Sequence, residues 1–205
     1  RIAANYIFPI TSAPIHNGFI DFADDGTVAA VGQLDGETSG TEFYNGILVP
    51  GFTNAHCHIE LSHLEGKFRE ATGMSGFIDQ INALRESAPK EQRIKAMRMQ
   101  FEKLYNEGVS AMADISNCDE SFAMKSGAEM YTRTFIEVFG SEPQDAESVI
   151  TEARRLLAKA VDAGIDAGIT PHSPYTMSAE LLRMASAEGL GTGFISYHNQ
   201  ESQEE

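Results

Sequence analysis

The first 49 residues alternate short apolar runs with turn residues, a pattern typical of β-strands. The segment GFIDFADDGTVAAVG places an Asp-Asp-Gly turn between two apolar runs, and it predicts a hairpin that pairs Phe19–Phe22 with Val28–Val31. The segment EFYNGILVP predicts two more short strands around Asn45 and Gly46. Residues 1–49 are therefore expected to form a β-rich region of their own.

From residue 50 onward, apolar runs that predict strands alternate with segments of helical spacing. The expected strands begin near residues 50, 109, 130, 166 and 193. The expected helices include MSGFIDQINALRES, KEQRIKAMRMQFEKLYNEG, DAESVITEARRLLAKAVDAG and SAELLRMASAEG. This alternation is typical of a parallel sheet or barrel. A closed barrel of this kind needs eight strands. The pattern therefore predicts an α/β fold, a partial (β/α)8 TIM-like barrel of about five βα units.

Composition and charge limit the partners of the protein. The chain is 42% hydrophobic and 22% charged, which is ordinary for a globular protein. Its net charge of −15 repels phosphates and anionic lipids, so we expect a small-molecule substrate and neither nucleic acid nor a membrane as partner. Cys57 and Cys118 show no paired spacing, which indicates no disulfide framework and favours a cytoplasmic location. The sequence is compatible with a homo-oligomer.

The chain opens on Arg1 rather than Met, and its first residues already have a strand pattern. We therefore expect it to be a fragment of a longer protein.

Two of the six histidines, His56 and His58, lie directly after an apolar run and a Pro-Gly break. On a strand, residues i and i+2 point to the same face, so these two imidazoles are expected to lie side by side. Barrel enzymes place their chemistry at the carboxyl ends of strands, and paired imidazoles suit neighbouring ligand positions on Zn²⁺. Taken alone, the pair is explained at least as simply by two structural histidines at a strand end as by two metal ligands.

Histidines at other predicted strand ends change that balance. His172 follows a predicted strand in TPHSPY, and His198 alternates with Ser196 in SYHNQES. Glu201 comes three residues after His198. Because the carboxyl ends of parallel strands meet at one edge of a sheet, these histidines favour a metal site at that edge.

Three segments, PGFTNAHCH, TPHSPYTMS and HNQESQEE, resemble successive motifs of the amidohydrolase superfamily. The branch they resemble contains cytosine deaminases, chlorohydrolases and aminofutalosine deaminases. The resemblance runs over essentially the whole chain, in the order and spacing of the family. It implies a distorted barrel with a small β-sandwich. Residues 1–49 would then be the N-terminal part of the sandwich, and residues 50–205 the N-terminal part of a metal-dependent hydrolase barrel.

Carried over by position, the resemblance implies roles for five residues. His56, His58 and His198 become ligands of one divalent metal, Zn²⁺ by preference and Fe²⁺ as the alternative. Glu201 becomes the catalytic proton shuttle, and His172 becomes a substrate contact.

Other residues of the motifs carry weaker implications. Glu205 falls on a second motif Glu of structural role, and Ser173 replaces the usual Ala. The later His and Asp ligands of the family have no counterpart, so the complete site is expected beyond residue 205. The given chain alone is expected to be inactive.

The expected activity is hydrolysis of a non-peptide C–N bond. It is deamination of an aminated heterocycle or nucleoside-like substrate, of the aminofutalosine, adenosine or cytosine type, by a metal-activated water. A cyclic amide hydrolase or a chlorohydrolase on the same site is an alternative, and a non-catalytic ligand-binding half-barrel is another. Two acidic residues stay ambiguous. Glu60 either shares the lumen face of His58, or is a first-turn carboxylate or a solvated loop residue. Asp114 either faces the lumen or forms hydrogen bonds at the rim of the core.

Overall fold

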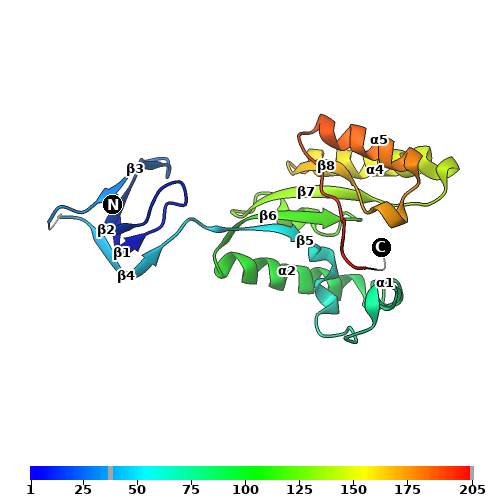
Figure 1. The fold of residues 1–205 in the computed structure, drawn as a ribbon, viewed down its shortest axis with the longest axis horizontal. Coiled ribbons are helices and arrows are strands. Elements are labelled where there is room, and N and C mark those ends of the chain that lie inside the picture. Colours follow the sequence, from blue (N-terminus) through cyan, green and yellow to red (C-terminus); the bar gives the residue numbers. More distant parts are fainter. Residues whose placement is uncertain (37–38, 204–205) are drawn as a thin grey trace. The chain divides into compact units, whose positions relative to one another are not determined.

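The computed structural model describes residues 1–36 and 39–203, which form two compact units, Arg1–Gly51 and Phe52–Glu205 (Figure 1). The first unit holds a four-stranded sheet in the order β3-β2-β1-β4. Its strands are β1 (Ile2–Ile7), β2 (Ile15–Phe22), β3 (Val28–Gln33) and β4 (Glu42–Leu48).

The hairpin predicted in the first unit is confirmed, because β2 and β3 are antiparallel and pair Phe22 with Val28. The two short strands predicted around Asn45 and Gly46 are instead one strand, β4, which lies parallel to β1. The register between β1 and β4 shifts at this point, as in a β-bulge. The Gly46 N–H there donates to the Asn5 Oδ1 atom at 2.7 Å. A side-chain acceptor thus satisfies a backbone group at the irregularity, and the strand continues through it.

The second unit is built on a parallel four-stranded sheet in the order β5-β6-β7-β8. The strands are β5 (Phe52–Cys57), β6 (Val109–Ser116), β7 (Tyr131–Val138) and β8 (Asp166–Pro171). The helices are α1 (Gly73–Leu84), α2 (Lys90–Asn106), α3 (Phe122–Lys125), α4 (Ala146–Asp162) and α5 (Ala179–Gly191), with 3-10 turns η1 (Ile59–Leu64), η2 (Pro143–Asp145) and η3 (Pro174–Thr176). This is the predicted α/β class, a part-barrel whose sheet is not closed. No helix among residues 1–36 and 39–203 is both long and apolar enough to cross a membrane.

The prediction of a fifth strand near residue 193 is wrong, because residues 193–203 form no strand. The Thr170 hydroxyl bonds both backbone groups of Ser196. It accepts from the Ser196 N–H at 2.8 Å and donates to the Ser196 carbonyl at 2.5 Å. The His198 N–H donates to the His172 carbonyl at 2.7 Å. A side chain thus replaces part of the expected ladder, and the segment still runs past the carboxyl ends of the strands (Figure 1).

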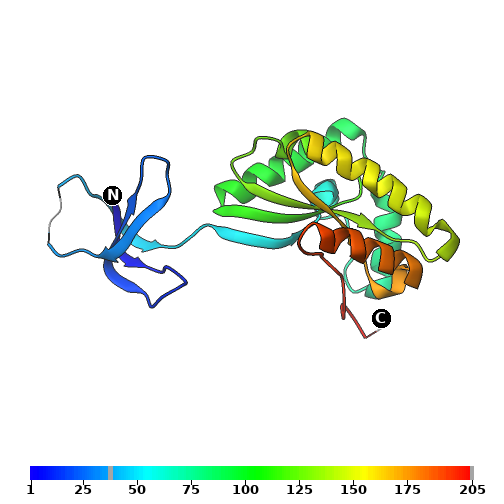
Figure 2. The same ribbon diagram turned by 90° about the horizontal axis from the view of Figure 1, so that it is seen from above.

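Helices cover the sheet of the second unit (Figure 2). Among the described residues, buried apolar side chains of these helices and strands form two cores. Helix α4 buries Ala146, Ile150, Ala153, Leu156 and Ala160. Their spacing of three and four residues gives one apolar face, which packs on β7 and β8 together with α5. Helix α2 and η1 pack beside β6 around Met97, Phe101 and Met112. These cores hold the strand ends that carry the polar residues described next.

Candidate metal and substrate site

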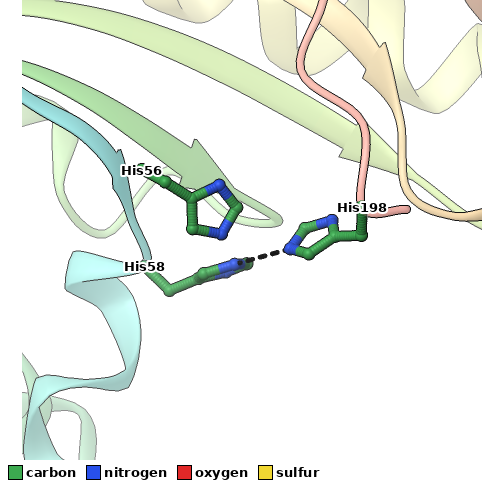
Figure 3. A group of neighbouring side chains, drawn as sticks. All are labelled: His56, His58 and His198. Atoms are coloured by element: carbon green, nitrogen blue, oxygen red, sulfur yellow. Dashed lines mark hydrogen bonds between the residues drawn. The ribbon is translucent and has the colours of Figure 1, made fainter. Parts of the chain in front are cut away.

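The structure brings His56, His58 and His198 together at the carboxyl end of the sheet (Figure 3). His56 lies near the end of β5, His58 directly follows that strand, and His198 arrives on the segment after α5. The ring centroid of His56 lies 5.1 Å from that of His58 and 4.7 Å from that of His198. One ring nitrogen from each residue lies within 4.8 Å of the others. Residues 140 positions apart in the chain thus share one cluster.

The nitrogen spacing in this cluster fits a metal ion. The Nε2 atoms of His58 and His198 are 3.3 Å apart (Figure 3). Two nitrogens that bind one tetrahedral Zn²⁺ at ~2.0–2.1 Å are separated by about 3.3 Å. The donor set therefore matches a divalent ion in both chemistry and spacing.

The tautomer of His198 is set by its backbone contact. The Nδ1 atom of His198 lies 3.2 Å from the His172 carbonyl oxygen, which only accepts, so Nδ1 is the donor. In the neutral ring the Nε2 lone pair then faces His58, as a metal ligand requires. A second group of potential ligands, Glu137, His172 and His198, shares this same residue.

Burial favours the neutral form of the imidazoles. It lowers the pKa of His58 to about 3, with the neighbouring His56 and His198 adding to the effect. Burial also lowers the pKa of His56, again with a contribution from His198. Neutral imidazoles present free lone pairs at pH 7, which is the form that binds a metal ion.

His172 lies just beyond β8, beside the cluster. Its Nδ1 atom is 2.8 Å from the hydroxyl oxygens of both Ser173 and Thr176, which fix the orientation of the ring. Its ring centroid is 4.6 Å from that of His198. Burial lowers the pKa of His172 to about 4. A neutral, oriented imidazole of this kind can exchange hydrogen bonds with a ligand.

Glu201 is exposed, and Tyr175 holds it by donating its hydroxyl to the Oε2 atom at 2.6 Å. Glu205 lies outside the described residues.

A pocket of about 240 Å³ opens beside the histidine cluster. Its walls combine apolar side chains from η1, α1 and the end of β7 with polar side chains from the strand ends. They are Leu61, Ile78, Ile81 and Phe139, and His58, Asn82, Arg85, Asn117, Glu137, His172 and Thr176. A small apolar pocket with a few convergent polar groups is the usual form of a ligand site.

Both ambiguous acidic residues are buried. Asp114 is fully buried, pairs with Lys125 and accepts the Ile59 N–H at 2.8 Å, so it holds the turn that follows His58. This agrees with the core-rim interpretation. Glu60 is 6% exposed, which excludes the solvated alternative, and burial raises its pKa. Its carboxylate accepts the Asn117 N–H and an Arg85 N–H, each at 2.9 Å.

The sequence reasoning missed Glu137, Asn117 and Arg85. The Asn117 side-chain amide donates to the Glu137 Oε2 atom at 3.2 Å and its backbone N–H donates to Glu60, so Asn117 links the two carboxylates. Burial raises the pKa of Glu137 to about 7. Asn117 and Glu137 each stand at the end of a predicted strand, so a survey of polar residues at strand ends would have found both.

A part-barrel with histidines gathered at its strand ends is an arrangement typical of barrel hydrolases that use a metal ion. Residues 47–193 match the model of the Amidohydrolase family, so the match covers well over half of the chain. The chain belongs to the amidohydrolase family. A search of curated proteins found no match.

Solved structures share the fold. The chain is similar to Helicobacter pylori aminofutalosine deaminase in complex with methylthio-coformycin (TM-score 0.73, 18% identity, 98% of this chain and 51% of that one). It is also similar to an adenosine deaminase from Xanthomonas campestris with bound zinc (TM-score 0.69, 16% identity, 97% and 48%). A third is the guanine deaminase from C. acetobutylicum with bound guanine (TM-score 0.62, 14% identity, 97% and 52%). The chain thus spans about half the length of these proteins, and at this identity the likeness concerns the fold.

Proposed function

We propose that the complete protein is a metal-dependent hydrolase that deaminates an aminated heterocycle or nucleoside-like molecule. The observation that carries the proposal is the convergence of His56, His58 and His198 with ring nitrogens at ligand spacing. The deaminases with similar folds support the choice of an amino leaving group. Aminofutalosine-, adenosine- and cytosine-type compounds are the candidate substrates. In this proposal residues 1–49 belong to a β-sandwich and residues 50–205 to the barrel.

His56, His58 and His198 would hold one divalent ion, with Zn²⁺ preferred over Fe²⁺. Such an ion supplies a water molecule whose pKa is lowered toward ~7, which is a nucleophile at neutral pH. Burial lowers the pKa values of His56 and His58, so these two ligand residues contribute no charge of their own. The positive charge of the ion is therefore kept for its water.

Glu201 would move the protons of the reaction. Oxygen from water forms a bond to the ring carbon, and Glu201 takes the released proton and passes it to the adjacent ring nitrogen. A second proton, from the hydroxyl group newly bonded to that carbon, goes to the amine; the C–N bond then breaks, the oxygen becomes a carbonyl and ammonia leaves. Tyr175 orients the carboxylate through its 2.6 Å hydrogen bond. His172, fixed at Nδ1 by Ser173 and Thr176, would bond the substrate through Nε2.

The test is metal analysis and an ammonia-release screen on the complete protein. The wild type is expected to carry one equivalent of metal and to release ammonia from at least one candidate. His58→Ala should lose the metal and the activity, whereas His16→Ala, a change in the first unit, should keep both. Glu201→Gln should keep the metal and lose about 100-fold or more in kcat, the scale of general acid–base catalysis.

Other outcomes separate the alternatives. Chloride release without ammonia would indicate a chlorohydrolase, and ring opening without ammonia would indicate a cyclic amide hydrolase. Ligand binding without turnover would support the non-catalytic half-barrel. Full activity of Glu201→Gln would remove Glu201 from the mechanism.

A further inference from the structure

The 3-10 turn η1 begins on a backbone N–H that a residue from another strand satisfies. His58 precedes the turn, and its side chain makes no capping hydrogen bond. The first N–H of the turn, that of Ile59, donates instead to the Asp114 Oδ1 atom in β6 at 2.8 Å. Ile59 is 2% exposed, so without this acceptor its N–H would be a buried donor that lacks a partner. Asp114 therefore caps the turn from the neighbouring strand.

The backbone at this point carries a candidate metal ligand. His58 lies between β5 and η1, so its position depends on the strand before it and on the bonded Ile59 N–H after it. The pairing of β5 with β6 is irregular between Asn54 and Cys57, so the strand alone holds this end less firmly. Within residues 1–36 and 39–203, the ring of His58 hydrogen-bonds only to His198, through Nε2. The backbone, rather than a side-chain partner, therefore determines where this imidazole lies.

Asp114 is itself fixed by a buried polar network. Its Oδ2 atom pairs with Lys125 of α3, and both side chains are fully buried. The Ser116 hydroxyl donates to the same Oδ2 atom at 2.9 Å. The Lys125 ammonium also donates to the hydroxyl oxygens of Ser116 at 3.2 Å and Thr134 at 3.0 Å. The carboxylate cannot turn its Oδ1 atom away from Ile59 without losing these contacts.

We propose that Asp114 is a positioning residue of the metal site, which fixes the backbone that carries His58 before any metal ion is bound. Lys125 holds Asp114 in this position. The inference rests on the proposed function, because it takes His58 as a metal ligand. A ligand residue that is already in place loses little freedom when it binds an ion, so removal of the acceptor should weaken metal binding.

Two double variants of the complete protein separate the acceptor from the ion pair. Asp114→Asn with Lys125→Met removes both charges and keeps a side-chain oxygen for the Ile59 N–H. Asp114→Leu with Lys125→Met removes both charges and the acceptor at similar volume. Each protein is stripped of metal with a chelator and titrated with Zn²⁺ against a chromophoric competitor. The variant with Asn should stay within about 3-fold of the wild-type affinity, and the variant with Leu should bind Zn²⁺ about 10- to 100-fold more weakly, the scale for outer partners of metal ligands.

Thermal unfolding of the same metal-free proteins tests for a merely structural role. Replacement of a buried ion pair by apolar side chains of similar volume is often tolerated, so the variant with Leu should still fold. A merely structural Asp114 would change its melting temperature and leave the Zn²⁺ affinity of the folded protein unchanged, which would overturn the inference. Asp119→Leu with Lys159→Met is the matched control: it removes an exposed ion pair and should leave the Zn²⁺ affinity unchanged.

Hydrogen exchange on the wild type needs no variant to fold. With the metal removed, the Ile59 amide should stay protected, because Asp114 holds it without help from an ion. Rapid exchange of this amide in the metal-free protein would overturn the inference. An Asn variant that binds Zn²⁺ as weakly as the Leu variant would overturn it too, because the acceptor would then not be what matters.

Ammonia release by the wild type separates this inference from the proposed function. The expected order of Zn²⁺ affinities without ammonia release would refute the deaminase and support the role of Asp114. Ammonia release with equal Zn²⁺ affinities in the wild type and both double variants would support the deaminase and overturn the role of Asp114.

Discussion

The two four-stranded sheets of this chain differ in how much they bury. In the first unit, the fully buried apolar side chains are Ala3, Ala4 and Ile7, while Phe43 and Ile47 are 52% and 59% exposed. In the second unit, strand β7 is buried over seven consecutive residues, from Thr132 to Val138. Such a run is typical of a parallel strand covered by helices.

This difference in burial explains why the buried ionisable side chains lie in the second unit. A charged side chain in a buried setting is held in place by the partners that it needs, as Asp114 is by Lys125 and the Ile59 N–H. The described residues of the first unit show no buried ionisable side chain of this kind. The candidate site therefore lies entirely on the sheet that the helices cover.

The largest effect on stability is expected when the charge on Lys125 is removed. Lys125 and Asp114 form an ion pair with both side chains fully buried. Lys125→Met leaves the Asp114 carboxylate uncompensated and should lower the free energy of unfolding by about 3–5 kcal/mol. Denaturant unfolding of the complete protein, followed by circular dichroism, measures the change.

The matched control is Lys159→Met, which breaks the pair with Asp119 at 44% and 42% side-chain exposure. Solvent screens this pair, so the change should cost about 0.2–1 kcal/mol. Equal effects of the two substitutions would mean that burial does not distinguish the pairs.

The second test compares the two apolar environments directly. Ile150 is fully buried in the core of α4, α5, β7 and β8, and Ile47 in β4 is 59% exposed. Ile150→Ala should cost about 2–5 kcal/mol, because it removes apolar contacts and leaves a cavity. Ile47→Ala should stay within about 0.5 kcal/mol. A larger loss from Ile47→Ala would show that its face is covered in the complete protein, and the contrast between the sheets would then be wrong.

Sequence patterns predicted the local features of this fold well. Helices α2 and α4 stop just before glycines with positive φ, Gly108 at 93° and Gly164 at 74°, and the i, i+2 spacing correctly paired His56 with His58. Both features depend on neighbouring residues alone. The segment of His198 was expected to be a strand because its alternation is strand-like, and the competing Thr170 hydroxyl lies 26 residues away.

The strand-end positions of Asn117 and Glu137 can be read from the sequence, but the hydrogen bonds of the buried polar network cannot, for the same reason. Glu137 reads as one charged residue in a strand, and its setting depends on Asn117, Arg85 and Glu60, which come from three other segments. The motif order of the family located the histidines, but it did not indicate this carboxylate.

The smallest expected effect concerns how α5, the helix before the His198 segment, begins. The Ser178 hydroxyl accepts the Leu181 N–H at 3.2 Å as an N-cap, and the residue is 7% exposed. Ser178→Ala should cost about 1 kcal/mol, because one backbone donor in the first turn loses its partner. Ser148→Ala is the control: its hydroxyl donates to the Asp145 carbonyl at an exposed site, and its loss should cost only a few tenths of that. Thermal unfolding of both variants measures the difference. If the two melting temperatures fall equally, capping of α5 adds nothing beyond an exposed turn contact, and the order of the segment that carries His198 must come from its own bonds to Thr170 and His172.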